Sequence, residues 1–158
     1  MGINAKKRLT GKWKSVGEGN YNLYFVFFEL GNFILKSNGV LGYITPNNYF
    51  TSLAGIKLRQ YLSEKRQITK IVNFNHLKLF ENAQTYTCIT FIKKDNDSDY
   101  FQYYYVEKSI ELNDLYNLNF SRYYFDWLNN KKWRLMAEED FKKYKENRNV
   151  WHAIGQIL

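Results

Sequence analysis

YNLYFVFFELGNFILK (residues 21–36), GVLGYITPNNYF (39–50) and IVNFNHLKLFENAQTYTCITFIKK (71–94) decide the fold of this chain, because its apolar residues crowd into these stretches. Residues 22–36 have the length of a helix and are apolar on nearly every side, which predicts a helix that is buried or covered by a partner. Residues 40–45 form a short apolar run typical of a strand buried on both faces, as in a parallel sheet. Ser37, Asn38 and Gly39 lie between the two and supply the turn chemistry expected at a helix C-terminus.

A second helix and further strands follow. Ser52 can cap a helix that continues to about residue 65, and residues 68–74 and 85–92 are rich in the β-branched and aromatic residues of strands. We expect residues 100–107 to form another strand, at an edge of the sheet. The predicted inward face of the helix holds Leu53, Ile56, Leu58 and Leu62, and its predicted outward face holds Lys57, Arg59, Lys65 and Arg66. This order of elements predicts an α/β fold with the open sheet of a Rossmann-like enzyme.

The composition bounds the class of protein. A chain of 158 residues with 45% hydrophobic content can bury one core. Cys88 is the only cysteine, which excludes an internal disulfide, and His76 and His152 are too few to assemble a zinc site. No uncharged apolar run reaches about 18 residues, and no secretory signal follows Met1, so we expect no membrane contact and a cytoplasmic location.

Positive charge and aromatic content favour a polyanionic partner. Lys and Arg number 23 against 15 Asp and Glu, which gives a formal charge of +8. The same charge is equally typical of a lysine-rich, solvated surface. Basic and aromatic side chains also interleave late in the chain, at Tyr103, Tyr104, Tyr105, Arg122, Tyr123 and Tyr124. One hypothesis is therefore a non-catalytic nucleic-acid-binding module with a basic, aromatic surface.

In their order and spacing, residues 21–94 resemble the C-terminal half of the catalytic domain of adenine-N6 DNA methyltransferases of restriction-modification systems, in the TaqI-like gamma group. The resemblance implies a partial Rossmann-like methyltransferase fold, with double-stranded DNA and S-adenosylmethionine as the partner and methyl donor of the full enzyme. The family's Asn-Pro-Pro-Tyr motif has no counterpart here, because Pro46 is the only proline. The glycine-rich donor loop is missing as well. We therefore assign no catalytic residue to this chain.

The resemblance also implies roles for particular residues. Phe80 would stack on an adenine flipped out of the duplex, and Pro46 and Asn47 would line the pocket for that base at the carboxyl end of a strand. Phe27 would pack on the adenine of the methyl donor. Without the resemblance, Phe27 is one more core aromatic residue, Pro46 and Asn47 form an ordinary turn, and Phe80 plugs the sheet edge.

Three regions are predicted from these patterns. Residues 1–20 form a polar arm or loop, residues 21–108 the C-terminal half of the methyltransferase domain, and residues 109–158 an extension and connector toward an absent recognition domain. The missing N-terminal half of the domain is the expected partner of the apolar helix and strand. Without it, we expect the chain to form a homo-oligomer or to cover its apolar surface with its own arm, and to lack methyltransferase activity.

Overall fold

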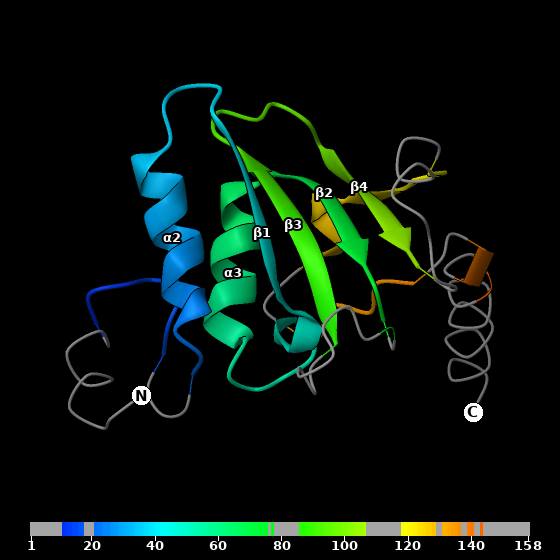
Figure 1. Cartoon of the computed structure of the whole chain (residues 1–158), viewed down its shortest axis with the longest axis horizontal. Coiled ribbons are helices and arrows are strands. Elements are labelled where there is room, and N and C mark those ends of the chain that lie inside the picture. Colours follow the sequence, from blue (N-terminus) through cyan, green and yellow to red (C-terminus); the bar gives the residue numbers. More distant parts are fainter. Residues whose placement is uncertain are drawn as a thin grey trace, which may run out of the picture.

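A mixed β-sheet with helices on one face forms the framework of the chain in the computed structural model (Figure 1). The structure describes residues 11–17, 21–75, 77, 86–106, 118–128, 131–136, 139–140 and 143. This arrangement confirms the predicted α/β class. The elements in chain order are α2 (Tyr24–Ile34), β1 (Val40–Pro46), the 3₁₀ helix η1 (Asn47–Phe50), α3 (Ile56–Lys65), β2 (Ile68–Asn73), β3 (Thr87–Lys93), β4 (Tyr100–Tyr105), β5 (Ser121–Tyr124) and the 3₁₀ helix η3 (Phe125–Trp127).

The strand directions bring three strand ends together. The order across the sheet is β1-β3-β2-β4-β5. Strand β3 is antiparallel to both of its neighbours, β1 and β2, whereas β2 is parallel to β4. Strand β5 is antiparallel to β4 on the far side. Strands β1, β2 and β4 therefore point the same way, and their last residues, Pro46, Asn73 and Tyr105, lie at one end of the sheet.

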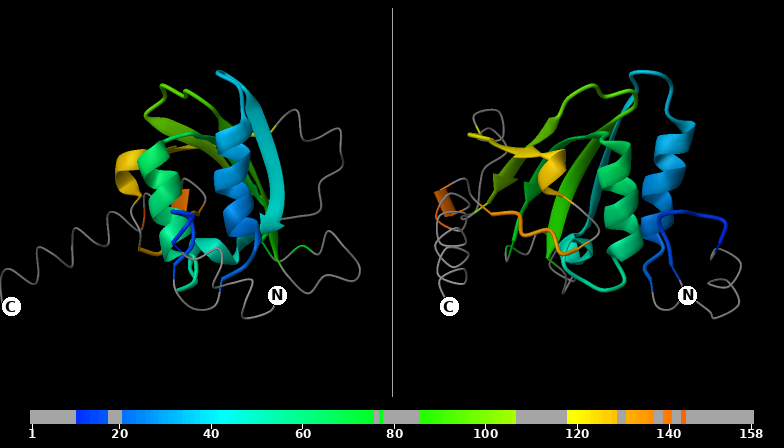
Figure 2. Two further views of the ribbon diagram at one scale, coloured as in Figure 1. Left: turned by 90° about the vertical axis from the view of Figure 1, so that its left-hand side faces the viewer. Right: turned by 180° about the vertical axis from the view of Figure 1, so that it is seen from behind.

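Helices α2 and α3 lie side by side on one face of the sheet (Figure 2). Phe25 and Phe28 of α2 and Leu58 and Leu62 of α3 are buried there. They join the buried residues of the facing side of the sheet, such as Ile71, in the main apolar cluster. Burial of these side chains is the dominant source of stability for such a layered fold.

The first predicted helix is confirmed, although α2 is a little shorter than residues 22–36. Gly31 allows the helix to approach β1 closely, since a Cβ there would lie 2.5 Å from Leu41 Cδ2 and 2.7 Å from Tyr43 Oη. The predicted turn is also present. Asn38 has a φ of 58°, in the left-handed region.

The prediction that residues 40–45 are buried on both faces is wrong. Strand β1 stands last in the described sheet, and Val40 and Ile44 are 62% and 49% exposed. Alternate side chains of a strand point to opposite faces, and the helices cover only the face that carries Leu41 and Tyr43. An apolar run does not reveal whether a second layer is present to cover its other face.

The prediction of an edge position for residues 100–107 is also wrong. Strand β4 lies between β2 and β5, so both of its edges are paired. Strand β5 comes from residues 121–124, a segment for which the sequence pattern predicted no definite element. The pairing partner of a strand depends on contacts distant in sequence, which periodicity does not report.

The second helix is rotated relative to its prediction. It begins at Ile56, after a turn in which Gly55 N–H donates to Ser52 Oγ at 3.2 Å. Leu53 and Ile56, predicted to face inward, are 81% and 36% exposed. Arg59, predicted to face outward, is 1% exposed because its side chain reaches backbone carbonyl groups beneath the helix.

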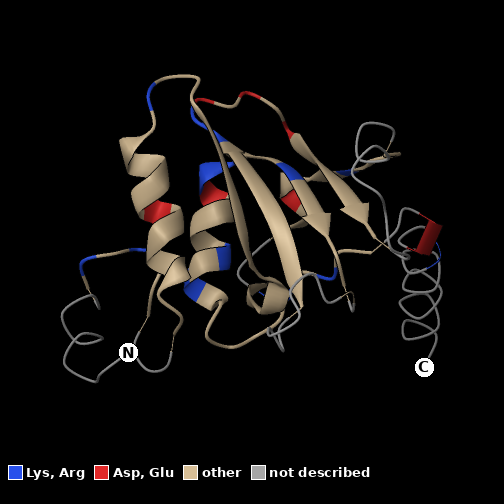
Figure 3. Cartoon of the chain, viewed as in Figure 1, with Lys and Arg blue, Asp and Glu red and all other residues tan. Residues whose placement is uncertain are grey.

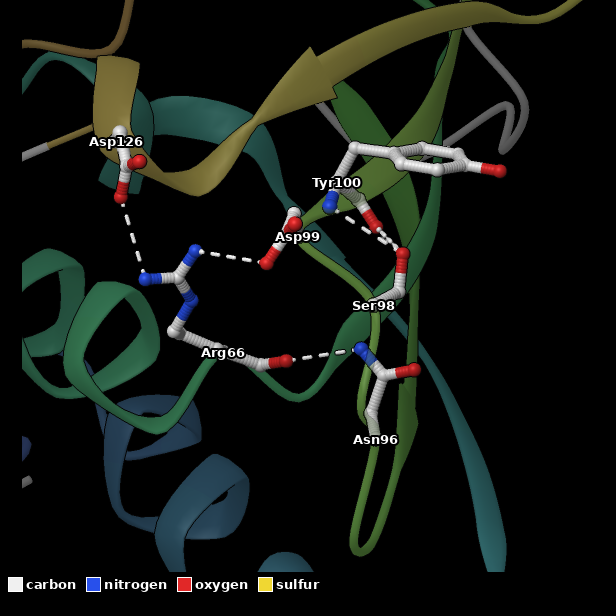
Figure 4. Close-up of polar contacts among 6 residues, drawn as sticks. All are labelled: Arg66, Asn96, Ser98, Asp99, Tyr100 and Asp126. Carbon is white, nitrogen blue, oxygen red and sulfur yellow. Dashed lines mark hydrogen bonds and ion pairs between the residues drawn. The ribbon is translucent and has the colours of Figure 1, made fainter.

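Arg66 contacts the segment before β4 and the residues after β5 at one end of the sheet (Figure 4). It follows α3 with a φ of 51°, and its guanidinium lies 3.5 Å from Asp99 and 3.2 Å from Asp126. The Arg66 carbonyl accepts a hydrogen bond of 2.9 Å from Asn96 Nδ2. These groups are exposed, so the ion pairs contribute at most about 1 kcal/mol each. Arg66 precedes β2, Asp99 precedes β4, and Asp126 follows the antiparallel β5, so the ion pairs lie at the end of the sheet opposite the last residues of β1, β2 and β4.

Candidate functional site

Polar side chains gather where β1, β2 and β4 end. In open α/β sheets, ligands bind beyond the carboxyl ends of parallel strands, because the loops there diverge and expose backbone and side-chain polar groups. Asn47 directly follows β1, and Asn73 is the last residue of β2. Tyr103 lies near the end of β4. We refer to Asn47, Asn73 and Tyr103 as the polar cluster.

Hydrogen bonds join the polar cluster into a chain. Asn47 Nδ2 donates to Asn73 Oδ1 at 2.9 Å, and Asn73 Nδ2 donates to Tyr103 Oη at 3.0 Å. The Tyr103 hydroxyl donates in turn to the Leu135 carbonyl at 3.2 Å. Asn73 is 6% exposed and also accepts from Asn75 N–H at 3.1 Å. A buried amide with three hydrogen bonds fixes the side chain of Asn47 in one orientation.

The start of α2 contacts the same end of the sheet. Tyr24 Oη donates to Asn48 Oδ1 at 2.7 Å. Asn47 N–H donates to the Tyr86 carbonyl at 2.9 Å. Tyr86 precedes β3, so the chain re-enters the sheet beside the residue that leaves β1. The loop after β1 is therefore held by a helix, by β2 and by the segment that leads into β3.

The structure brings two of the predicted site residues to this end of the sheet. Pro46 and Asn47 are half-buried neighbours at the end of β1. Phe27 lies on α2, is 44% exposed and is not among the residues of the helix that are buried. The reading of Phe27 as a core aromatic residue is therefore wrong. Phe80 lies outside the described residues, so its predicted role stays a prediction.

The phenols of the site are neutral at pH 7, and burial raises their pKa values further. Desolvation raises the pKa of Tyr24 and of Tyr103 well above their ordinary value of 10, and it raises the pKa of Tyr49 as well. Desolvation also raises the pKa of the Cys88 thiol, behind the polar cluster, to about 11. These groups act as hydrogen-bond donors and acceptors at neutral pH. The arrangement suits recognition of a polar, uncharged group rather than acid–base catalysis.

Sequence reasoning missed several residues of the site. The sequence did hold a signal for Asn73, because an amide follows the β-branched run of residues 68–72 at the point where a strand of an α/β sheet would end. The sequence held no signal that distinguishes Tyr103, since it is one of several adjacent tyrosines.

The structure does not favour the nucleic-acid-binding surface predicted from residues 103–124. Tyr103 and Tyr123 are 1% and 2% exposed and belong to the core. Arg122 stacks over its neighbour Tyr100 at 5.0 Å from the ring centroid. Base stacking requires accessible ring faces, which the buried members lack.

The part of the chain that the structure describes contains neither a metal site nor a membrane-spanning helix. No group of three or more His, Cys, Asp or Glu side chains is placed to hold a metal ion there. Within the same residues, no helix has the length and apolar character needed to span a membrane.

Comparison with known proteins places this chain in the class of restriction-modification methylases. Residues 1–80 match the model of the Eco57I restriction-modification methylase family. The chain is 38% identical over 127 residues to the type II restriction enzyme and methyltransferase RM.Eco57I of Escherichia coli, covering 78% of this chain. It is 35% identical over 66 residues to the type II methyltransferase M.BanIII of Aneurinibacillus aneurinilyticus, covering 42% of this chain.

The chain therefore belongs to the Eco57I restriction-modification methylase family. A similar fold occurs in the type IIG restriction endonuclease BpuSI, with a TM-score of 0.60 and 15% identity over 78% of this chain and 17% of that structure. The match spans only 12% of RM.Eco57I and 11% of M.BanIII. The chain thus corresponds to a small part of its relatives.

Proposed function

We propose that this chain is the C-terminal half of the catalytic domain of a TaqI-like, gamma-group adenine-N6 DNA methyltransferase. The full enzyme would transfer a methyl group from S-adenosylmethionine to the exocyclic amine of an adenine flipped out of duplex DNA. The chain would supply one wall of the pocket for that base. Residues from 109 onward would lead toward a recognition domain outside this chain.

The arrangement of the strands supports the proposal that the chain forms the second half of a Rossmann-like domain. Strands β1 and β2 are parallel to one another and flank the antiparallel β3, while α2 and α3 cover one face. β1 has no partner on its other side among the described strands. A Rossmann-like sheet would continue at that point with the strands of its first half.

The polar cluster is the observation that carries the proposal. It holds Asn47 by a buried hydrogen-bond chain at the end of the sheet where ligands bind. A flipped base presents hydrogen-bonding groups on its Watson–Crick edge and a flat ring for stacking. The half-buried amide of Asn47 would meet that edge, with Asn73 and Tyr103 holding it from behind, and Phe80 would provide the stacking face.

This chain offers only some of the groups that would bind the methyl donor. Phe27 offers an exposed aromatic ring that could pack on the donor's adenine. The sequence holds no glycine-rich donor loop, since the lone Gly17-x-Gly19 lacks the third glycine and the preceding strand. We infer that the isolated chain does not hold S-adenosylmethionine, and that the donor supplies its reactive methyl group only in the full domain.

Methyl transfer tests the proposal. The chain alone should transfer no tritiated methyl group from S-adenosylmethionine to DNA. Transfer should appear when the chain is combined with the segment of RM.Eco57I that precedes its match to this chain, together with that enzyme's remaining C-terminal portion. Mass spectrometry should identify the product as N6-methyladenine. Asn47→Ala should lower the rate, whereas Leu53→Ala, at an exposed position away from the cluster, should not. A methylated cytosine, or activity of the chain alone, would contradict the proposal.

A further inference from the structure

Tyr103 links the polar cluster to a segment that lies much later in the chain. Its hydroxyl accepts a hydrogen bond from Asn73 Nδ2 at 3.0 Å and donates to the Leu135 carbonyl at 3.2 Å, so the phenol acts as acceptor and donor at once. Asn73 Oδ1 accepts in turn from Asn47 Nδ2 at 2.9 Å. The orientation of Asn47, next to the end of β1, therefore depends on a backbone carbonyl far away in the sequence.

Residues 131–136, which we call the late segment, are themselves held in place. The Lys131 carbonyl accepts from Arg59 Nε at 2.7 Å, and Trp133 N–H donates to the Phe50 carbonyl at 2.8 Å. The ring of Trp133 is 3% exposed and stacks on Phe50 with centroids 6.4 Å apart. The right-hand view of Figure 2 shows the late segment, drawn in orange, with one end beside η1. Its carbonyl groups are thus fixed acceptors.

The elements around the polar cluster offer Asn47 no ion pair. β1, η1 and β4 contain no Lys, Arg, Asp or Glu, as the tan colour of β1 and η1 in Figure 3 shows. Asn73 and Tyr103, which hold Asn47 from behind, are 6% and 1% exposed. In such a buried, uncharged setting, neutral hydrogen bonds orient a side chain, and loss of one partner leaves the other unsatisfied.

We propose that Tyr103 is a positioning residue for methyl transfer, because its hydroxyl ties Asn73 to the late segment and thereby holds Asn47 in the orientation that meets the target base. This inference rests on the proposed function, which places Asn47 in the pocket for a flipped adenine. Tyr103 is too deeply buried to touch the base and acts only through Asn73 and Asn47. Catalysis by orientation is sensitive to small displacements, so a rotation of Asn47 should lower the rate of the chemical step.

Tyr103→Phe tests the inference, since it removes the hydroxyl and keeps the buried ring. Tyr61→Phe is the matched control, because the Tyr61 hydroxyl also accepts from a buried asparagine, Asn32 Nδ2, at 2.8 Å. Asn32 lies on α2 beside the first residues of β1, at the other end of that strand from Asn47. Each substitution leaves an asparagine amide without its acceptor, so both should lower stability to urea by similar amounts.

Single-turnover methylation separates positioning from stability, because its rate constant does not depend on the fraction of enzyme that is folded. The enzyme is assembled from this chain and the remaining segments of RM.Eco57I. At saturating DNA and S-adenosylmethionine, Tyr103→Phe should lower the rate constant about tenfold or more, whereas Tyr61→Phe should lower only the amplitude. Asn47→Ala should lower the rate constant as well. Adding Tyr103→Phe to Asn47→Ala should cost less than about a further twofold, because both substitutions act through one side chain.

The outcomes separate this inference from its alternatives. An unchanged rate constant in Tyr103→Phe, equal losses in both tyrosine variants, or additive losses in the double variant would overturn it. In the full chain alone, the NMR signals of the Asn47 side-chain amide should move toward random-coil positions in Tyr103→Phe and stay in place in Tyr61→Phe. Unchanged signals in Tyr103→Phe would also overturn the inference. If the signals move as expected but the assembled enzyme methylates no adenine, the link from Tyr103 to Asn47 stands and the proposed function fails.

Discussion

Replacing Arg59 with methionine should destabilise the chain strongly, although helix position alone marks Arg59 as a surface residue. The guanidinium is buried beneath α3. Its Nη1 donates to the Tyr49 carbonyl at 2.6 Å and to the Ser52 carbonyl at 2.9 Å, and its Nε donates to the Lys131 carbonyl at 2.7 Å. The hydrogen bonds of this one side chain thus connect α3 to η1, to the turn before α3 and to the segment that begins at residue 131.

The magnitude follows from these contacts. Each hydrogen bond from a charged donor contributes about 1.5–3 kcal/mol, and Arg59→Met would leave the accepting carbonyl groups without this donor. Burial lowers the pKa of Arg59, which shows that the charged form is desolvated in the fold, and removal of that charge offsets part of the loss. We expect a net decrease in the free energy of unfolding of about 2–4 kcal/mol.

Urea unfolding followed by tryptophan fluorescence measures the effect. Lys57→Met is the matched control, because Lys57 is an exposed basic residue on the same helix and its loss should change stability by about 0.5 kcal/mol or less. Arg59→Lys should fall between the two, since an ammonium group cannot reach all the carbonyls at once. Hydrogen exchange should also increase at Trp133, whose N–H donates to the Phe50 carbonyl. Equal stabilities of Arg59→Met and Lys57→Met would refute the reasoning.

Other changes test the site and its surroundings. In the reassembled enzyme, Phe80→Ala should lower kcat/KM by about 5- to 150-fold with little change in donor binding, and Phe80→Trp should retain more activity than Phe80→Leu. The reverse order, with a lower melting temperature, would identify Phe80 as a core residue. Asn73→Ala removes its hydrogen bonds to Asn47, Asn75 and Tyr103 and should lower the free energy of unfolding by about 2–3 kcal/mol, measured by urea titration; an unchanged midpoint would show that the cluster is not formed. Because burial raises the pKa of Cys88 from 9.0 to about 11, the folded state retains a proton that the unfolded state releases, so stability should fall by about 2 kcal/mol as pH rises from 9 to 11. Cys88→Ala should flatten that decline, and an identical pH profile would contradict the assignment.

Much of the framework was predictable because it depends on local patterns. The apolar run of residues 22–36 and the Ser37-Asn38-Gly39 turn predicted α2 and its end, and the β-branched segments predicted β2 and β3. Helix formation, turn chemistry and strand propensity all act between near neighbours in sequence. The order and spacing of these segments also supported the assignment to restriction-modification methylases, which the family match confirms.

The candidate site was predictable only where a residue follows a strand. Pro46 and Asn47 could be located because a turn directly after an apolar strand marks the end of a sheet. Asn73 and Tyr103 could not be joined to them from the pattern alone. Their association requires β2 to lie beside β4 and β1 to be parallel to both, which are pairings between residues far apart in the chain.

The sequence by itself determined the α/β class, the first helix, the strands on either side of Phe80 and the family. Only the tertiary structure decided which faces are covered. In the folded chain Arg59 is buried and β4 lies between β2 and β5. Val40 and Ile44 of β1 and one face of α2, with Phe27 and Ile34, are exposed. The physical reason is that hydrophobic pattern records a residue's preference for burial, whereas burial itself requires another layer to pack against it.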